Sequence, residues 1–403
     1  MLSCGIEEAL KQEYLDEGIW RGIIRTQGQE IPFNFEVIRE DSVTYDLNFI
    51  NGEERVNIKG LAMQGDSVFI PIYIFDAGIK ARLIGNKLIG TYEKYYEGKS
   101  KLTFEATYNL PFRFPPKAST KSLVTNIEGK WEVSFNNNGG TTKAIGVFKQ
   151  YGDKVEGTFV TSLGDFRYLE GTVNDTTLWL SSFDGANTFL FKAQIKNPNE
   201  MKGEFWSGAT LYQTWQAVKN DLAVMPRFAS ENLIAEGTKP FNFNLTDLNG
   251  KMVSLSDKKY KDKIKVVHMF GAWCPNSIDE VRFLADWHRQ NKGLDVAILG
   301  LAFEQKDDFT YAKNRVNKMA NKLNAQYEFL VAGSAEKDIA VQKFPSLKSI
   351  ETFPTTIILD HNNKIREIFA GFRGPGSGTY YEEHTKMFNE IIQELLAEKN
   401  KEY

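Results

Sequence analysis

The chain divides into two parts that differ in the spacing of their apolar residues. From about residue 18 to 218, apolar and polar positions alternate in short runs that end at Gly, Asn or Asp, and this pattern predicts β-strands joined by tight turns. From about residue 240 onward, short apolar runs alternate with longer segments of helical periodicity, which is typical of an α/β domain. Residues 221–239 follow neither pattern, and we interpret them as a linker, with residues 1–17 as an N-terminal tail.

The β-rich part, residues 18–220, contains an internal repeat. Gly18-Ile19-Trp20 recurs as Gly129-Lys130-Trp131, the segment 75–78 (Phe-Asp-Ala-Gly) recurs at 183–186 (Phe-Asp-Gly-Ala), and 88–92 recurs at 201–205. These offsets of 108 to 113 residues are too long for a solenoid and favour a duplicated β-meander over about 18–110 and 125–218. The Gly-x-Trp opening resembles lipocalin-like barrels, and the pattern leaves open whether one large barrel or two small ones form.

Residues 240–403 contain the elements of an alternating α/β domain. The pattern predicts a hairpin over 241–245 and 252–255, strands over 264–270, 294–303, 355–359 and 364–369, and helices over 275–290, 308–324 and 380–399. The strand over 294–303 is almost continuously apolar, so we expect it to be buried on both faces of a sheet.

Composition excludes several classes of protein. Apolar residues make up 42% and charged residues 25% of the 403 residues, so a largely disordered chain is excluded. Lys and Arg (49) nearly balance Asp and Glu (52), and without a basic excess we expect no nucleic acid as a partner. The two cysteines, Cys4 and Cys274, cannot form a disulfide framework, and no apolar run approaches the ~18 residues of a membrane-spanning helix.

Cys4 is a candidate for lipid attachment. Leu2-Ser3-Cys4-Gly5 resembles the end of a bacterial lipoprotein signal, although the charged and apolar regions that precede such a site are not in the sequence. We therefore predict a lipid anchor at Cys4 as the one link to a membrane, and a location in the cell envelope on the periplasmic side. The alternative is an ordinary exposed N-terminal cysteine, with a cytoplasmic location if the sequence begins at its true start.

Cys274 is the candidate nucleophile. It follows the apolar run 264–270 and precedes a helix that begins with Pro275, so it stands where a strand turns into a helix. Unpaired backbone N–H groups and the positive end of the helix dipole stabilise a thiolate there, which predicts a lowered pKa for this thiol. Ser277 lies three residues on, with its hydroxyl near the same sulfur. The alternative is an inert cysteine of the core.

The residues around Cys274 resemble a known family. Trp273-Cys274-Pro275-Asn276-Ser277, followed by Asp279-Glu280 and later by residues 353–356 (Phe-Pro-Thr-Thr), is similar to the thioredoxin-like disulfide oxidoreductases of the TlpA type, especially those of Bacteroidetes-like bacteria. The resemblance covers about residues 230 to 400 and implies an α/β thioredoxin fold. The run 164–171 (Gly-Asp-Phe-Arg-Tyr-Leu-Glu-Gly) resembles the β-rich domain that precedes such modules.

The resemblance implies roles for individual residues. Cys274 matches the attacking cysteine and Pro354 the cis-proline, beside which Trp273, Pro275 and Phe353 are expected to bind the substrate. A cis X-Pro bond of this kind exposes backbone groups that pair with the substrate chain.

Two further residues are expected to assist proton transfer. Glu280 matches an acidic residue one turn into the helix, beneath Ser277, where it could tune proton transfer. His268 stands at the strand position at which thioredoxins have a buried acid, and its imidazole could take a proton from a reacting thiol. The alternatives are a solvated glutamate on a helix surface and a core histidine with its hydrogen bonds satisfied.

Ser277 is the departure from the family pattern, because the family has its second cysteine at this position. In a dithiol enzyme the second thiol resolves the mixed disulfide at a high effective concentration, up to ~10⁵ M. Serine cannot do so. Cys274 can therefore attack a disulfide, but release has to wait for an outside thiol, and Cys4 is too distant in the chain to be expected as the resolving group.

Other motifs carry less chemistry. The glycine-rich run 371–378 looks like a phosphate cradle but lacks the Gly-Lys-Ser/Thr ending, so we interpret it as a flexible loop before the last helix. The four histidines lack metal-ligand spacing, and we expect neither a metal nor a cofactor. Gly271 stands where a peroxiredoxin would have Thr, which argues against a peroxidase.

Two functions from different classes fit these residues. The first is an envelope thiol-disulfide oxidoreductase with a single thiol, whose partners are protein or small-molecule disulfides and thiols. The second is a redox-inactive thioredoxin-fold scaffold in a protein whose β-rich domain binds a ligand or partner. The pKa of Cys274 separates them, because a clearly lowered pKa supports chemistry and a normal or raised pKa supports the scaffold.

Overall fold

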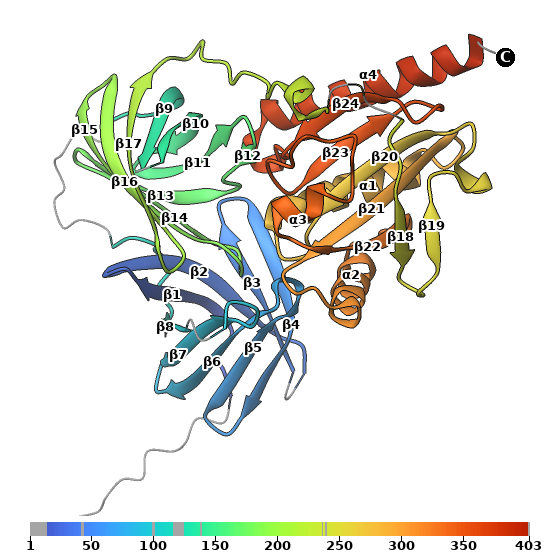
Figure 1. Ribbon diagram of the computed structural model, residues 1–403. Helices are drawn as coiled ribbons and strands as arrows, with labels where there is room; N and C mark the ends of the chain where they lie inside the picture. Colours follow the sequence, from blue (N-terminus) through green and yellow to red (C-terminus); the bar gives the residue numbers. More distant parts are fainter. Residues whose placement is uncertain are drawn as a thin grey trace, which may run out of the picture.

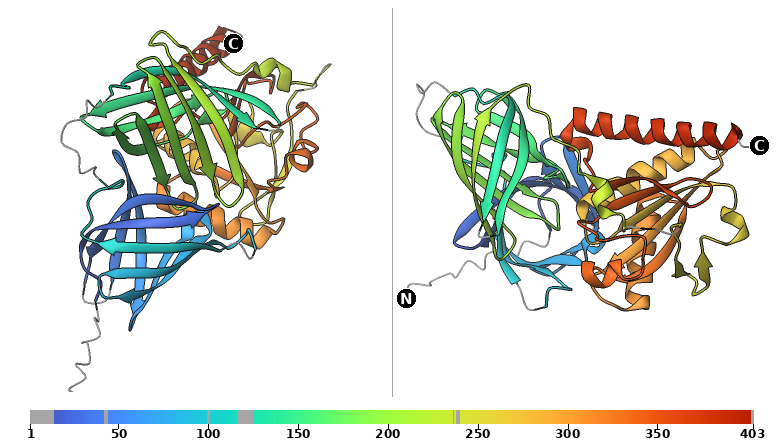
Figure 2. Two further views of the ribbon diagram at one scale, coloured as in Figure 1. Left: turned by 90° about the vertical axis from the view of Figure 1, so that its left-hand side faces the viewer. Right: turned by 45° about the horizontal axis from the view of Figure 1, so that its top comes forward.

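A computed structural model describes residues 14–41, 44–98, 101–115, 125–137, 139–235, 237 and 240–401. The chain forms two antiparallel β-barrels and a C-terminal α/β domain, which packs against both barrels (Figure 1). The two further views show the barrels side by side, with the α/β domain against them (Figure 2). The predicted tail and Cys4 lie outside the described residues, apart from residues 14–17.

The first barrel closes from eight strands in sequence order. These are β1 (Gly18–Thr26), β2 (Gln29–Arg39), β3 (Tyr45–Asn51), β4 (Glu54–Gln64), β5 (Ser67–Ile72), β6 (Ala77–Ile84), β7 (Lys87–Lys94) and β8 (Lys101–Tyr108), with the short helix η1 (Tyr73–Phe75) after β5. Pairing of β1 with β8 closes the barrel and leaves no open edge in it.

The second barrel repeats this arrangement. Its strands are β9 (Gly129–Asn137), β10 (Gly140–Tyr151), β11 (Lys154–Thr161), β13 (Leu169–Asn174), β14 (Thr177–Phe183), β15 (Thr188–Asn197), β16 (Glu200–Ser207) and β17 (Leu211–Lys219), with the two-residue strand β12 (Gly164–Asp165) added at β11. Neighbouring strands pair in sequence order, and pairing of β17 with β9 closes the ring. The duplicated meander therefore forms two small barrels.

The matching Gly-x-Trp segments adopt the same conformation. Gly18 and Gly129 have φ of 111° and 112°, in the region that favours glycine. Two residues later, the indole Nε1 of Trp20 donates to the Asp16 carbonyl at 2.9 Å, and that of Trp131 donates to the carbonyl four residues before it at 2.8 Å. Both indoles are fully buried, so an equivalent tryptophan packs inside the first strand of each barrel.

Aromatic side chains fill the interior of the second barrel. The rings of Phe191 and Phe205 stack at 4.2 Å between centroids, and Phe159 lies 4.7 Å from Phe191. Phe135 and Trp215 pack against the same rings and are also buried. Side chains therefore occupy this interior, as in other small barrels.

The α/β domain has a seven-stranded sheet in the order β19-β18-β22-β21-β20-β23-β24. Its strands are β18 (Asn244–Asp247), β19 (Met252–Ser254), β20 (Ile264–Phe270), β21 (Val296–Glu304), β22 (Glu328–Ser334), β23 (Thr355–Leu359) and β24 (Ile365–Ala370). The helices are α1 (Pro275–Gln290), α2 (Phe309–Leu323), α3 (Lys337–Val341) and α4 (Thr379–Lys401), with η2 (Ser230–Leu233), η3 (Lys258–Tyr260) and η4 (Pro375–Ser377) as short 3₁₀ turns. The predicted elements are confirmed to within a few residues, whereas β22 and α3 had no counterpart in the prediction.

Alternation along β20 gives the sheet two buried faces. Val266 and Phe270 point into the core that contains α1, α2 and α4, while Val267 and Met269 point into the core on the opposite face. All seven residues of β20 are buried. Because β20 lies between β21 and β23 and is covered on both sides, its C-terminal end is a fixed base for the loop that carries Cys274.

Phe183 joins the two barrels. It ends β14 of the second barrel but lies in the core of the first, with its ring 4.5 Å from that of Phe33, 4.8 Å from Phe49 and 5.2 Å from Tyr92. The Tyr92 hydroxyl donates to the Gly185 carbonyl at 3.0 Å. The hairpin between β14 and β15 therefore plugs one end of the first barrel.

Arg113, which follows β8, is buried and contacts both barrels. Arg113 donates to the Ser181 carbonyl of the second barrel at 2.8 Å and to the side-chain oxygen of Asn51 in the first barrel at 3.4 Å. Glu170 lies 3.6 Å from its guanidinium. An arginine with partners in both barrels holds them in one relative position.

Candidate functional site

Cys274 occupies the N-cap of α1, directly after the loop that follows β20. Its φ and ψ are extended, Pro275 is the first residue of the helix, and the Ile278 N–H donates to the Cys274 carbonyl at 3.1 Å. The sulfur is half-buried, and its thiol donates to the Phe353 carbonyl at 3.4 Å. The predicted position of the cysteine at a strand-to-helix turn is therefore confirmed.

The predicted lowering of the Cys274 pKa is wrong for this structure. Burial raises the pKa of the thiol above its ordinary value of 9.0, and hydrogen bonds from Ser277 and Asn276 oppose this shift without cancelling it. The sequence indicated the favourable helix N-terminus at Cys274, but not that residues of both barrels lie over it in the folded chain. Removal of water disfavours the thiolate more than the helix end favours it.

Ser277 is fully buried beneath the thiol. Its hydroxyl oxygen accepts the Gly271 N–H at 3.4 Å, so the side chain is tied to the loop before Cys274. Cys274 is the one cysteine among the residues that the structure describes. In this part of the chain there is no second sulfur to complete a dithiol pair.

The peptide bond between Phe353 and Pro354 is cis, as the resemblance implies. The Pro354 carbonyl accepts the Gly371 N–H at 2.9 Å, and the ring of Phe353 lies perpendicular to Trp273 at 6.3 Å. The indole Nε1 of Trp273 donates to the Phe303 carbonyl at 3.0 Å. The structure thus brings Trp273, Cys274 and Phe353 together, as expected of neighbours in one site.

His268 of β20 and Glu280 of α1 form a buried pair. The imidazole Nδ1 lies 2.5 Å from the Glu280 carboxylate, a contact that satisfies an ion pair in distance but not a hydrogen bond in geometry. The other Glu280 oxygen accepts the Thr356 hydroxyl at 2.9 Å. Glu280 is therefore not the solvated helix residue of the alternative interpretation, and both groups lie in the interior.

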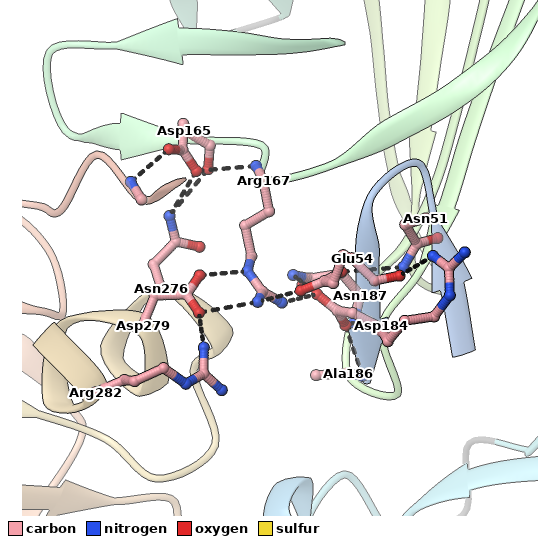
Figure 3. A network of polar contacts seen from close by, with 12 residues as sticks. Asn51, Glu54, Asp165, Arg167, Asp184, Ala186, Asn187, Asn276, Asp279 and Arg282 are labelled. Carbon is pink, nitrogen blue, oxygen red and sulfur yellow. Dashed lines mark hydrogen bonds and ion pairs between the residues drawn. The ribbon is translucent and has the colours of Figure 1, made fainter. Parts of the chain in front are cut away.

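Arg167 links all three parts of the chain, although no motif in the sequence indicated a role for it. Arg167 is buried, and its guanidinium lies 2.8 Å from Asp279 on α1, 2.9 Å from Asp184 and 2.6 Å from Glu54 of the first barrel (Figure 3). The run 164–171 and the Asp279-Glu280 pair both stood out in the sequence, but no spacing indicated that they meet. Three carboxylates around one buried guanidinium compensate the cost of burying it.

Asp165 on β12 also joins the second barrel to the glycine-rich loop 371–378 and to the start of α1. Its carboxylate accepts the Gly374 N–H at 2.6 Å, and its carbonyl accepts the side-chain amide of Asn276 at 3.0 Å (Figure 3). Burial raises the pKa of Asp165 from 3.8 to about 7.

This contact corrects the prediction of a flexible glycine-rich loop. A Cβ on Gly371 would lie 2.1 Å from the Leu163 carbonyl oxygen, so β12 and the loop are packed backbone against backbone. The Gly374 N–H that a phosphate would use already binds the Asp165 carboxylate. The loop is a docking surface for the second barrel.

A second buried carboxyl group binds the loop between β20 and α1, directly before Cys274. Glu304, at the end of β21, accepts the Ala272 N–H at 2.8 Å, and burial raises its pKa from 4.5 to about 7. Arg315 of α2 donates to the Ala272 carbonyl at 3.1 Å and to the Ile74 carbonyl of the first barrel at 2.6 Å. The backbone before Cys274 is thus tied to both the sheet and the first barrel.

A cavity of about 360 Å³ opens over the sulfur. Its lining comes from both barrels and from the α/β domain: Lys94, Tyr96, Glu97, Asp165, Phe166, Ala186, Asn187, Phe189, Trp273, Cys274, Pro275, Asn276 and Gln305. Among the described residues, no group of three or more His, Cys, Asp or Glu side chains is placed to hold a metal ion.

The packing of Trp273 explains why position 271 is a glycine. A Cβ at this position would lie 2.1 Å from the indole Nε1 of Trp273, so a threonine here would displace that ring. The conformation of Trp273 in this site is therefore incompatible with the threonine that a peroxiredoxin requires at this position.

The fold and the site define a thioredoxin-like domain with a single described thiol at the start of its first helix. The AhpC/TSA family model matches residues 237–368. The chain is 26% identical to the thiol-disulfide oxidoreductase ResA of Bacillus thuringiensis over 164 residues, 41% of this chain and 79% of that protein. It is 34% identical to ResA of Bacillus subtilis over 74 residues, 18% of this chain and 40% of that protein. The C-terminal domain is thus related to ResA-type and TlpA-type thiol-disulfide oxidoreductases.

Solved structures with similarity to the chain include a thiol:disulfide interchange protein from Chlorobium tepidum, at 18% identity over 40% of this chain and 98% of that chain, with a TM-score of 0.30. Another is the thioredoxin domain of a thiol-disulfide oxidoreductase from Bacteroides vulgatus, at 20% identity over 38% of this chain and 98% of that chain, with a TM-score of 0.29. Over the ranges that the structure describes, no helix is both long and apolar enough to cross a bilayer.

Proposed function

We propose that the protein performs thiol-disulfide exchange through the single thiol of Cys274 and forms mixed disulfides that an external thiol releases. The observation that carries the proposal is the position of Cys274 in a domain related to thiol-disulfide oxidoreductases. Cys274 is the N-cap residue of α1, its sulfur contacts the Phe353 carbonyl at 3.4 Å, and the residue lines a cavity. In this proposal His268 and Glu280 act on the proton of the thiol, while Trp273, Pro275, Phe353 and Pro354 contact the bound disulfide.

Ser277 determines how the reaction ends. After Cys274 attacks a disulfide, one half of the disulfide stays bound to its sulfur and the other half leaves as a thiol. A hydroxyl at position 277 cannot displace the bound half. An external thiol therefore has to attack the mixed disulfide and restore Cys274.

The test introduces the missing sulfur. With hydroxyethyl disulfide as substrate, the Ser277→Cys variant should shorten the lifetime of the mixed disulfide at least about a hundredfold, because an internal thiol acts at a high effective concentration. Intact-protein mass spectrometry after removal of excess disulfide follows the lifetime. Ser277→Ala, which adds no sulfur, should leave it unchanged, and Cys274→Ser should form no adduct at this site.

Two results would contradict the proposal. One is an unchanged lifetime in Ser277→Cys. The other is turnover by the natural protein, in an insulin-type dithiol reductase assay without added monothiol, as fast as by a dithiol thioredoxin.

A second function, a redox-inactive scaffold, is favoured by one observation, the raised pKa of Cys274. In this case the thioredoxin-like domain is a rigid support for the barrels. Failure of Cys274 to form a mixed disulfide with any small disulfide, with the fold intact, would favour the scaffold.

We also propose that the protein resides in the cell envelope with a lipid on Cys4, on the basis of the Leu2-Ser3-Cys4-Gly5 motif. Expression of the natural gene in a bacterial host with labelled fatty acid should label the protein, and Cys4→Ala should abolish the label. Fractionation of the Cys4→Ala protein with the cytoplasmic proteins would contradict an envelope location.

A further inference from the structure

The cavity over Cys274 is walled by three separate parts of the chain. Lys94, Tyr96 and Glu97 come from the segment that ends β7 of the first barrel, Phe166 and Phe189 come from the second barrel, and the α/β domain supplies the floor. Its volume of about 360 Å³ lies at the lower end of the range for small-molecule sites, about 300–1,000 Å³. A molecule of amino-acid size fits there, and a folded protein does not.

The walls are fixed by buried contacts. Separation of the second barrel from α1 would break the buried ion pair of Arg167 with Asp279, so that Arg167 would keep only its partners outside α1 and Asp279 would keep only Arg282. Separation of the barrels would withdraw Phe183 from the core of the first barrel. These contacts keep the cavity at its present size and limit what can approach the sulfur.

Three charged residues line the cavity, namely Lys94, Glu97 and Asp165. The Asp165 carboxylate is already bound by the Gly374 N–H, whereas Lys94 and Glu97 pair with each other at 2.9 Å, with side chains 19% and 42% exposed. An ion pair that is still in contact with water stabilises the fold by little, so each of the two groups can exchange its partner for an opposite charge on a ligand. The aromatic walls suit the carbon and sulfur atoms between such charges.

We propose that the Cys274 cavity takes a low-molecular-weight disulfide that bears ammonium and carboxylate groups, of the size and charge of cystine. The inference rests on the proposed function and names its substrate class. Lys94 binds the carboxylate, Glu97 binds the ammonium group, and the disulfide lies over the sulfur of Cys274.

The reaction is one thiol-disulfide exchange. The Cys274 thiol gives up its proton, its sulfur forms a bond to one sulfur of the ligand, and the ligand's own S–S bond breaks. The leaving half takes the bonding electron pair and a proton and departs as a thiol. Cys274 is oxidised to a mixed disulfide and the leaving half is reduced, so a second low-molecular-weight thiol restores the protein by the reverse exchange.

The test compares disulfides on the full chain. Cystine should add one cysteinyl group at Cys274, located by peptide mapping, about tenfold or more faster than insulin forms a mixed disulfide there, because the insulin bond cannot be positioned over the sulfur. Gln305 is an exposed cavity residue, and Gln305→Trp should fill the cavity and slow cystine and hydroxyethyl disulfide alike. Lys306→Trp, at the next exposed position outside the lining, should slow neither.

Charge variants test the recognition directly. Lys94→Gln and Glu97→Gln should each slow the reaction with cystine about threefold to fivefold and leave the uncharged hydroxyethyl disulfide unchanged. Equal rates for cystine and insulin, or charge variants without effect on cystine, would overturn this proposal while single-thiol exchange stands. Failure of Cys274 to react with any disulfide would instead overturn the proposed function.

Discussion

At the scale of single residues, Cys274 combines two opposing influences. The helix end beneath it favours the thiolate, and the barrels that cover it remove the water that would solvate the charge. The second influence is larger, because burial raises the pKa. A raised pKa lowers the thiolate fraction at neutral pH, but the thiolate that does form is the more nucleophilic for it.

We therefore expect slow alkylation of Cys274 at neutral pH. Because its pKa is raised, the rate with iodoacetamide at about pH 7 should lie below that of free cysteine and should rise ~10-fold per pH unit until the pH passes the pKa. Peptide mass spectrometry, with added free cysteine as the internal standard, measures both rates. A plateau below about pH 8 would show that the thiolate is stabilised after all.

At the scale of elements, the repeated hairpin of each barrel contacts another domain of the molecule. In the second barrel the segment 183–186 enters the core of the first barrel through Phe183. In the first barrel the matching segment 75–78 follows η1, where the Asp76 carboxylate accepts the Tyr311 hydroxyl of α2 at 2.7 Å. Duplication thus supplied two copies of one hairpin: the copy in the second barrel contacts the first barrel, and the copy in the first barrel contacts the α/β domain.

Truncation of the plug tests this arrangement. Phe183→Ala should lower the free energy of unfolding by about 3–5 kcal/mol, because it leaves a cavity among Phe33, Phe49 and Tyr92. Tyr151→Ala, at a residue of the same barrel that is 63% exposed, should change it by less than ~0.5 kcal/mol. Urea unfolding of both variants makes the comparison, and equal small effects would show that the barrels do not depend on the plug.

At the scale of the whole molecule, a carboxyl group with a raised pKa lies near the contact of each barrel with the α/β domain. Asp165 lies between the second barrel and the glycine-rich loop, and Glu304 lies beside Arg315, which contacts the first barrel. Burial raises both pKa values to about 7. An acid with a raised pKa binds its proton more tightly in the folded protein, so its contribution to stability falls as the pH rises from its unfolded pKa to about 7.

The Asp165→Asn variant isolates one of these groups. Between about pH 4 and pH 7 the natural protein should lose stability relative to Asp165→Asn, because in this interval the folded protein still holds on Asp165 a proton that the unfolded chain has given up. Thermal or urea unfolding over this range gives the slope of stability against pH for each protein. Asp338→Asn, at an exposed position of α3, should keep the natural slope, and an identical slope in Asp165→Asn would contradict the assignment.

The local features of this protein can be predicted from its amino-acid sequence alone. Periodicity located α1 and β20, repeated Gly-x-Trp segments indicated the duplication, and the residues around Cys274 placed the thiol at a helix start. These features depend on neighbours in the chain, since hydrophobic spacing and capping act over a few residues. The departure at Ser277 needs no structure, because an absent sulfur is visible in the sequence.

The surroundings of the thiol, by contrast, depend on contacts that form only when the chain folds. The contacts of Arg167 with Glu54 and Asp279 join residues more than 100 positions apart, and no local pattern encodes such a meeting. The sign of the Cys274 pKa shift follows from the same cause, since it depends on how much water the barrels exclude. Burial is a property of the assembled chain, and therefore the chemistry of this cysteine was settled by the packing of three domains around it.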